Sequence, residues 1–236
     1  MNTLNSSFQT QVDSAIRNLD AVSVNINYSN QSKTILDNSF NLNISSNMLS
    51  AMSDLFISLS GTELKADQVN LYDFSGYVLE AGISTIVKKT DGSKDEWIEV
   101  ARELEGKKVL TPPYCTREYT KTATYDQWFI SLYRSFNNQY KRGVGVIETA
   151  KQCKSVFKSI ITYKKKNHED AASIYVFDSN GDLIYPYDIS QEYKAALQPY
   201  YELTKGDDSA LTFISPLTGK TEYAAEAVSS YTGYTY

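Results

Sequence analysis

The segments VNLYDFSGYVL (Val69–Leu79) and IYVFDSNGDLI (Ile174–Ile184) decide the fold, because they are weak copies of one pattern. Each holds a β-rich apolar run, an aspartate, a glycine three residues later and a second apolar run, which is typical of a β-hairpin. Asp73 and Asp178 lie 105 residues apart. A repeat of about 100 residues is far longer than the repeats of a solenoid, so it predicts two tandem modules of similar construction.

Helical patterns precede and follow both copies. Near the N-terminus, apolar residues recur at steps of three and four positions and mark one face of a helix: Phe8, Val12, Ile16, Leu19 and Val22. This pattern continues to about Asp37 and predicts a helix about 50 Å long, at about 1.5 Å per residue. Further helices are predicted at Ser45–Gly61, Lys94–Leu104, Ala150–Tyr163 and Gln191–Thr204.

Long strands are predicted downstream of each copy. They are TATYDQWFISLYRSF (Thr122–Phe136) and GVGVIET (Gly143–Thr149) for the first copy, and TEYAAEAVSSY (Thr221–Tyr231) and TGYTY (Thr232–Tyr236) for the second. A shorter strand is expected around Lys108–Thr111. Helices that alternate with hairpins of neighbouring strands predict the α+β class with antiparallel sheets.

Alternation along Thr122–Phe136 separates two faces of the predicted strand. One face carries Trp128, Ile130, Leu132, Arg134 and Phe136, and the other carries Phe129, Ser131, Tyr133 and Ser135. The first face is mainly apolar and the second is amphipathic. We therefore expect a strand that contributes to a core and also offers polar groups.

The composition is that of a soluble globular protein, with 42% hydrophobic and 22% charged residues. A formal net charge of −5 gives no general attraction to nucleic acid. No apolar run approaches the roughly 20 residues that span a bilayer, and no leader of basic then apolar residues is present. Since the sequence begins inside a helical pattern and ends in a strand-like one, we expect a segment of a longer protein.

Enzymatic motifs are absent from the sequence. It has no GxSxG, HExxH or Walker pattern, and its single histidine, His168, lies in a charged connector. The segment Asp178–Ile184 resembles the start of a calcium loop, but Leu183 and Ile189 replace the required glycine and glutamate, so a hairpin turn is predicted. We expect no catalytic residue, no metal and no cofactor.

The two cysteines, Cys115 and Cys153, have no companion residues at zinc-binding spacing. They leave two alternatives open, a single disulfide bond or two free thiols. The 19 tyrosines are the compositional anomaly. A tyrosine offers an apolar ring with a hydroxyl handle, which suits surfaces that recognise polar ligands, although half-exposed strand positions explain most of them.

Several segments together resemble one family. FQTQVDSAIRNLDAVSVNINYSN (Phe8–Asn30), WFISLYRSF (Trp128–Phe136), GVGVIET and SSYTGYTY (Ser229–Tyr236) are similar to the double Cache ectodomains of YesM-like sensor histidine kinases of Gram-positive bacteria. The resemblance implies a long N-terminal stalk helix over residues 1–40, a membrane-distal PAS-like (Cache) module over 41–163 and a membrane-proximal one over 164–236.

The resemblance also implies a function. The chain would be the extracellular sensor of a two-component membrane protein, flanked by transmembrane helices and followed by a kinase portion outside this sequence. A small ligand in the distal module would pass a signal to the membrane through the proximal module and the terminal helices. A homodimer through the N-terminal helix is a further expectation.

The candidate ligand site lies along the predicted strand. In the amino-acid-binding branch of the family, a tryptophan followed by an aromatic residue binds ligand, and Trp128 and Phe129 match this pair. Asp126 and Lys121 occupy the positions of the family's ligand-binding arginine and tyrosine, and the family's later acidic position falls on Glu148 or Ala150, so recognition of an amino acid by that scheme is not expected. The ring of Trp128 with the carboxylate of Asp126 as acceptor suits a sugar or another neutral polar ligand. The candidate ligand-binding residues are Tyr114, Tyr125, Asp126, Trp128, Tyr133, Arg134 and Glu148.

Structural alternatives stand beside these assignments. Trp128 also suits a core or rim position, Arg134 a pair with a carboxylate at the edge of the module, and Glu148 a structural role at a strand end. The distal module could also lack a small-molecule ligand and respond to a partner such as a solute-binding protein.

Overall fold

The computed structural model describes residues 2–30, 32–33, 46–61, 64–74, 77–82, 85–91, 97–119, 124–137, 143–167, 172–204 and 211–236. The chain forms two compact units. Unit 1 consists of Met1–Ile16, Pro112–Trp128 and Cys153–Tyr236, and unit 2 consists of Arg17–Thr111 and Phe129–Gln152. Both units are discontinuous in sequence, and the module limits 1–40, 41–163 and 164–236 stay a prediction. Among the described residues, no helix has the length and apolar character needed to cross a membrane.

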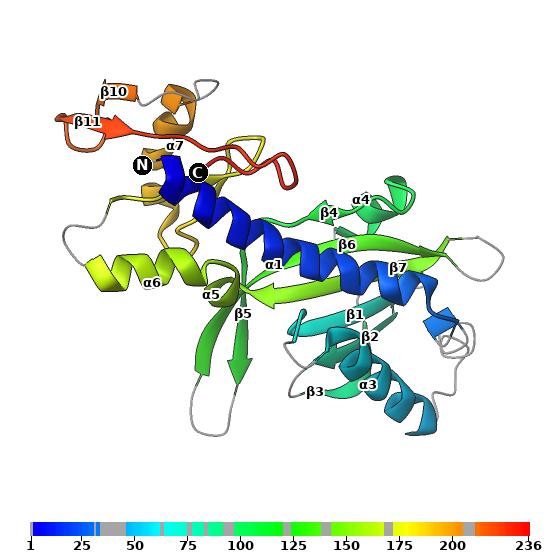
Figure 1. Cartoon of the computed structure of the whole chain (residues 1–236). Helices are drawn as coiled ribbons and strands as arrows, with labels where there is room; N and C mark the ends of the chain where they lie inside the picture. The colour runs from blue at the N-terminus through cyan, green and yellow to red at the C-terminus, as the bar shows by residue number, and fades with distance from the viewer. Residues whose placement is uncertain are drawn as a thin grey trace. The chain divides into compact units, whose positions relative to one another are not determined.

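Figure 1 labels the elements in chain order. The helices are α1 (Asn2–Tyr28), α3 (Ser46–Ser60), α4 (Trp97–Glu103), α5 (Cys153–Val156), α6 (Lys158–Asn167) and α7 (Gln191–Thr204). The strands are β1 (Gln68–Asp73), β2 (Tyr77–Gly82), β3 (Thr85–Asp91), β4 (Val109–Leu110), β5 (Tyr114–Tyr119), β6 (Thr124–Asn137), β7 (Gly143–Gln152), β8 (Val176–Phe177), β9 (Leu183–Tyr185), β10 (Leu211–Ile214) and β11 (Thr221–Ala224).

The helix α1 buries the apolar stripe that the sequence predicts. Its side chains at three- and four-residue steps are at most 3% exposed: Phe8, Val12, Ile16, Leu19, Val22 and Ile26. The helix ends at Tyr28, and the predicted continuation to Asp37 falls largely on residues 34–45, outside the described residues. Residues Asn2–Ile16 of α1 belong to unit 1, and Arg17–Tyr28 belong to unit 2.

A seven-stranded antiparallel sheet with the order β3-β2-β1-β7-β6-β4 dominates unit 2, and β5 pairs with β6 off this path. The first repeat forms the predicted hairpin, with Leu71 of β1 opposite Leu79 of β2. β7 fills the centre by pairing with β1 on one side and β6 on the other. The turn at residues 75–76 lies outside the described residues.

The two faces of this sheet meet different helices. On one face, the hydroxyl of Thr149 in β7 donates to the carbonyl of Leu19 in α1 at 3.2 Å. Figure 1 shows α1 running along β6 and β7. On the other face, Tyr133 packs in a cluster with Ile98 and Ala101 of α4. Because alternate residues of β6 point to opposite faces, the faces predicted from the sequence are confirmed for Ile130 to Phe136.

A carboxylate of α1 holds two cations within unit 2. Asp20 pairs with Arg134 of β6 and, at 3.2 Å, with Lys108. The guanidinium of Arg134 also donates to the carbonyl of Gly106 and, at 3.1 Å, to the hydroxyl of Ser23. The Asp20 and Arg134 side chains are only 22% and 13% exposed, so solvent screens this pair less than a surface pair.

The second repeat forms the predicted hairpin in unit 1. β8 and β9 are antiparallel, and the carboxylate of Asp178 accepts bonds from the backbone N–H groups of Asn180 and Asp182 at 2.8 and 2.9 Å. Gly181 has φ +88°, and a Cβ there would lie 2.6 Å from the ring of Tyr201. Both its backbone conformation and the available space therefore require glycine. Asp178 therefore caps the turn of the predicted hairpin.

The helices that follow each strand group lie close to the predicted ranges, although residues 150–152 of the predicted Ala150–Tyr163 belong to β7 and the rest is divided into α5 and α6. Cys153, Val156, Phe157 and Ile160 are buried in or between α5 and α6. α7 has the predicted limits, and α4 lies within the predicted Lys94–Leu104, whose first three residues are outside the described part. Cys115 is exposed, Cys153 is buried, and both are free thiols.

The prediction of two long strands at Thr221–Tyr231 and Thr232–Tyr236 is wrong. Regular pairing of β11 with β10 ends at Ala224. The carbonyl of the next residue, Ala225, instead accepts a hydrogen bond from the side-chain amide of Asn5 at 2.6 Å. Residues 227–236 instead fold on themselves, with the N–H of Ser229 donating to Tyr234 and the N–H of Gly233 donating to Ser229. The turn occurs where Gly233 adopts φ +75°, a conformation that no regular strand contains.

We predict that Asp20→Asn lowers the free energy of unfolding by about 2–3 kcal/mol, because it leaves two partly buried cations without their carboxylate. The matched control is Glu99→Gln, which removes the i,i+3 pair with Arg102 whose side chains are 68% and 55% exposed. That change should stay within about 0.5 kcal/mol. Urea denaturation measures both, and equal losses would contradict the role given to Asp20.

Candidate ligand site

Glu148 is a buried carboxylate surrounded by hydrogen-bond donors in unit 2. It is 3% exposed. The amide of Asn70 and the phenol of Tyr72 each donate to its Oε2 at 2.8 Å, and the hydroxyl of Ser131 donates to Oε1 at 2.5 Å. Tyr133 lies directly across from Glu148 in the β6–β7 ladder. These contacts join three strands of the sheet through one side chain.

The other candidates of unit 2 have structural partners as well. Tyr133 is 3% exposed, and its ring is stacked on that of Tyr72 with centroids 6.1 Å apart. Arg134 faces the opposite side of the sheet, where it pairs with Asp20. The structure therefore brings Tyr133 and Glu148 together and separates Arg134 from them.

The remaining candidates belong to unit 1. Trp128 is half-buried, with its ring 5.9 Å from that of Tyr187 and the ammonium of Lys194 6.0 Å from its centroid. Asp126 is exposed and Tyr114 is half-buried. The backbone of Tyr125 lies in β6, but its side chain is outside the described side chains, as are Lys121 and His168.

A cavity of about 530 Å³ lies in unit 1, in a region that the sequence analysis did not single out. Its walls come from α1, the segment 172–177, α7, the β10–β11 hairpin and the C-terminal hairpin. Among the described residues that line it, seven are aromatic: Tyr175, Phe177, Tyr193, Tyr200, Phe213, Tyr223 and Tyr236. The volume falls within the range of about 300–1,000 Å³ that is typical of small-molecule sites.

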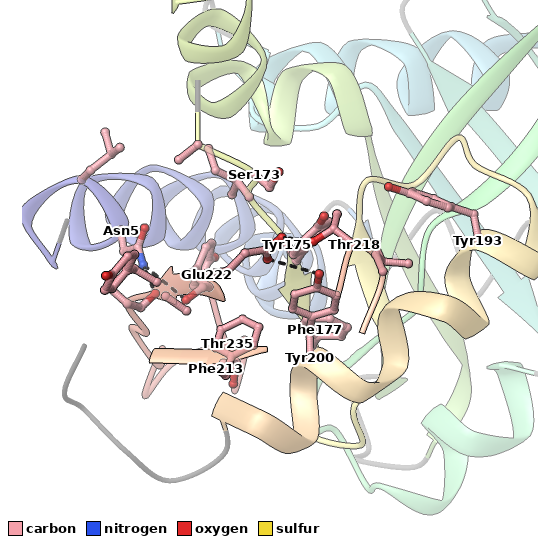
Figure 2. Close-up of a pocket in the computed structure, with 18 residues that line it drawn as sticks. Asn5, Ser173, Tyr175, Phe177, Tyr193, Tyr200, Phe213, Thr218, Glu222 and Thr235 are labelled. Atoms are coloured by element: carbon pink, nitrogen blue, oxygen red, sulfur yellow. Dashed lines mark hydrogen bonds between the residues drawn. The ribbon is translucent and has the colours of Figure 1, made fainter. Parts of the chain in front are cut away.

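Three rings make one wall of the cavity at steep angles to one another. The centroids of Tyr175 and Tyr200 are 5.4 Å apart with planes at 45°, and those of Tyr200 and Phe213 are 5.6 Å apart at 83°. Figure 2 shows these side chains gathered with Glu222, and Asn5 and Tyr193 at opposite ends of the labelled group. Tilted and edge-to-face contacts of this kind are the arrangements that aromatic rings prefer.

Glu222 of β11 supplies a carboxylate to this wall. The hydroxyl of Thr218 donates to its Oε1 at 3.1 Å, and the phenol of Tyr200 lies 3.3 Å from its Oε2. The same phenol is 2.6 Å from the hydroxyl of Ser215. The half-buried carboxylate is therefore held in place by residues that themselves line or adjoin the cavity.

The phenols of the wall are neutral. Burial raises the pKa of Tyr175 to about 12, with a nearby contact to Ser173 opposing the shift. Burial also raises the pKa of Tyr200, and the charge of Glu222 adds to this shift. At physiological pH the two side chains therefore present uncharged rings and hydroxyl groups.

The compositional signal for this cavity was the excess of tyrosine, which the sequence analysis assigned mostly to half-exposed strands. Five of the seven aromatic residues of the cavity are tyrosines. They come from four separate parts of the chain, so neither their spacing nor their order marks a site. Asn5, 220 residues before Ala225, completes the rim through its hydrogen bond to that carbonyl.

Comparisons with known proteins identify the fold. No protein-family model and no curated protein sequence matches the chain. Among solved structures, the periplasmic sensory domain of the Campylobacter jejuni chemoreceptor Tlp1 matches with TM-score 0.62 at 14% identity, over 100% of this chain and 91% of that one.

Two further structures have similar scores. A domain of a sensory box/GGDEF family protein from Vibrio parahaemolyticus gives TM-score 0.65 at 12% identity over 99% and 92% of the two chains. The ligand-binding domain of the Pseudomonas aeruginosa amino-acid chemoreceptor PctC, in complex with GABA, gives 0.61 at 8% identity over 99% and 94%. The chain therefore has the fold of the Cache-type sensory domains, as its sequence resemblance implies. The YesM-like branch stays a prediction.

We predict that Glu148→Ala lowers the free energy of unfolding by about 3 kcal/mol or more, because it removes the acceptor of three buried donors. Glu148→Gln retains one oxygen and should cost about 1–2 kcal/mol. Glu103→Gln, at an exposed position of α4, is the control and should change stability by less than about 0.5 kcal/mol. Urea denaturation is the measurement, and a loss below about 1 kcal/mol for Glu148→Ala would contradict a structural role.

Proposed function

We propose that this chain is the extracytoplasmic sensing domain of a membrane receptor and that it binds a small molecule in the cavity of unit 1. The observation that carries the proposal is the cavity itself, with its volume of about 530 Å³, its aromatic walls and the carboxylate of Glu222 held among them. Mostly apolar walls with a few fixed polar groups are the usual construction of a ligand site. The fold supports the sensory role, since the similar structures are sensory domains by their names.

The cavity adjoins the helix that would transmit the signal. Asn5 of α1 lines the cavity and bonds the carbonyl of Ala225. One turn further along α1, Gln9 donates to the carbonyl of Val228 at 3.1 Å. One turn beyond that, the hydroxyl of Ser229 donates to the carboxylate of Asp13 and lies 2.8 Å from both of its oxygens. A ligand that prefers one arrangement of this hairpin on α1 would shift the population of that arrangement.

The output of the receptor belongs to the proposal as well. In the family that the sequence resembles, a sensor of this kind controls a histidine kinase across the membrane, and we propose the same output here. A dimer through α1 is the corresponding assembly. A solute-binding protein as the direct signal is the competing proposal, and it predicts a response to that protein without any small molecule.

The segment around Trp128 is a second candidate for ligand contact. Trp128 is half-buried beside Tyr187, and the exposed Asp126 lies two residues before it in β6. A ring face with a nearby carboxylate suits the hydroxyl groups of a sugar or another neutral polar ligand. Since the ring of Trp128 packs on that of Tyr187, ligand contact there competes with a purely structural role.

We expect a thermal-shift screen of sugars, amines, amino acids and organic acids to find a ligand of the wild-type protein. At about 100 times its dissociation constant, a ligand stabilises by about 2.7 kcal/mol, which raises the melting temperature by about 5–10 °C. Ala172→Trp places an indole at an exposed residue of the cavity lining and should abolish the shift.

Ala195→Trp is the matched control, because Ala195 is exposed on α7 and does not line the cavity. This variant should keep the full shift. If no small molecule raises the melting temperature and a purified solute-binding protein does, the ligand proposal is wrong. If Ala172→Trp keeps the shift, the ligand binds elsewhere.

Trp128→Ala separates the second candidate from the first. We predict a loss of about 1–3 kcal/mol in unfolding free energy from the lost packing on Tyr187, with the ligand-induced shift retained. Differential scanning fluorimetry with and without the ligand measures both quantities. A variant that is stable but no longer responds to ligand would place the site at Trp128 instead.

A further inference from the structure

The described lining of the unit 1 cavity contains an acidic side chain but no basic one. Among the described residues that line it, Glu222 is the one with a formal charge, and no lysine, arginine or histidine joins it. A ligand carboxylate or phosphate would therefore lose its hydration without gaining a cationic partner from this lining. These charges disfavour an anionic ligand, so a cationic or a neutral ligand fits this lining better.

The aromatic wall favours a cationic ligand over a neutral one. The face of an aromatic ring carries negative potential and attracts a cation within about 6 Å of its centroid. Tyr175, Tyr200 and Phe213 all line the cavity, and their neighbouring planes meet at 45° and 83°, so the three rings differ in orientation. Both phenols are uncharged at physiological pH, and burial raises the pKa of each further from that range, so the attraction of these two rings for a cation comes from the neutral ring.

Glu222 adds an acceptor at the same wall. A carboxylate has about four lone-pair positions. Thr218 takes one on Oε1, and Tyr200 lies within reach of Oε2, which leaves acceptor capacity for a donor inside the cavity. A charge-assisted bond from an ammonium or hydroxyl group of the ligand would use that capacity.

We infer that the cavity of unit 1 takes a small organic cation, such as an alkylated ammonium compound or a primary amine, with its charge against the Tyr175–Tyr200–Phe213 wall and next to Glu222. This inference rests on the proposed function, because it names the ligand class of the same cavity. It is independent of the sugar ligand considered for the Trp128 segment.

Choline and its uncharged isostere 3,3-dimethylbutan-1-ol provide the direct test, since they match in shape and hydroxyl group and differ in charge. Isothermal titration of the wild-type chain should show choline binding at least about tenfold more tightly than the isostere. Tetramethylammonium should bind and acetate should not. Equal affinity for choline and the isostere would overturn the inference, although the cavity would remain a ligand site.

Two variants test whether choline binds at the aromatic wall beside Glu222. Glu222→Gln keeps the shape of the side chain without its charge and should weaken choline binding about tenfold or more, while the exposed Glu202→Gln on α7 should leave it unchanged. Tyr175→Leu keeps an apolar wall without a ring and should weaken choline more than the isostere. Should Glu222→Gln fail to fold, Tyr175→Leu still decides the question.

The outcomes distinguish this inference from the function on which it rests. If neither choline nor tetramethylammonium binds at 10 mM but another class of compound binds and is blocked by Ala172→Trp, the cation assignment is wrong and the sensory function stands. If no compound of the wider screen binds, both are wrong. If choline binding survives Glu222→Gln, Tyr175→Leu and Ala172→Trp, the cation site lies outside this cavity.

Discussion

Burial of a single apolar stripe on α1 is the constraint on which the rest of the structure depends. Six side chains from Phe8 to Ile26 are almost completely removed from solvent, each worth about 1.5–3 kcal/mol in transfer free energy. The first part of the helix belongs to unit 1 and the second to unit 2. Neither unit is complete without the part of α1 that it contains, so the fold of each depends on residues that precede all of the described strands in the chain.

Two carboxylates on α1 form specific hydrogen bonds and ion pairs with the segments that pack on the helix. Asp13 holds the C-terminal hairpin through Ser229 and Thr232, and Asp20 holds Arg134 and Lys108. Apolar packing alone tolerates small shifts along a helix, whereas hydrogen bonds lose most of their strength when the geometry changes. Asp13 and Asp20 therefore set the position of α1 against its neighbours, while the burial of the apolar stripe supplies most of the free energy of packing.

The two groups of polar side chains differ in what surrounds their carboxylate. Glu148 is enclosed by donors from its own sheet and ties three strands together. Glu222 lies at the edge of a cavity, with Thr218 and Tyr200 holding it in place. The first arrangement is typical of a structural network, whereas the second carboxylate borders the cavity in which we propose a ligand, although the sequence had pointed only to Glu148.

The sequence by itself determined the elements whose signals are local. The three- and four-residue steps of α1, the alternation along β6 and the aspartate-glycine turn of Asp178 and Gly181 each fix a conformation through neighbours a few residues away. The double Cache resemblance placed these elements in the right fold. Only the tertiary structure decided the partners of Glu148, the short pairing of β11 and the cavity around Glu222. Those features depend on contacts such as Asn5 with Ala225, 220 residues apart, for which no periodicity exists.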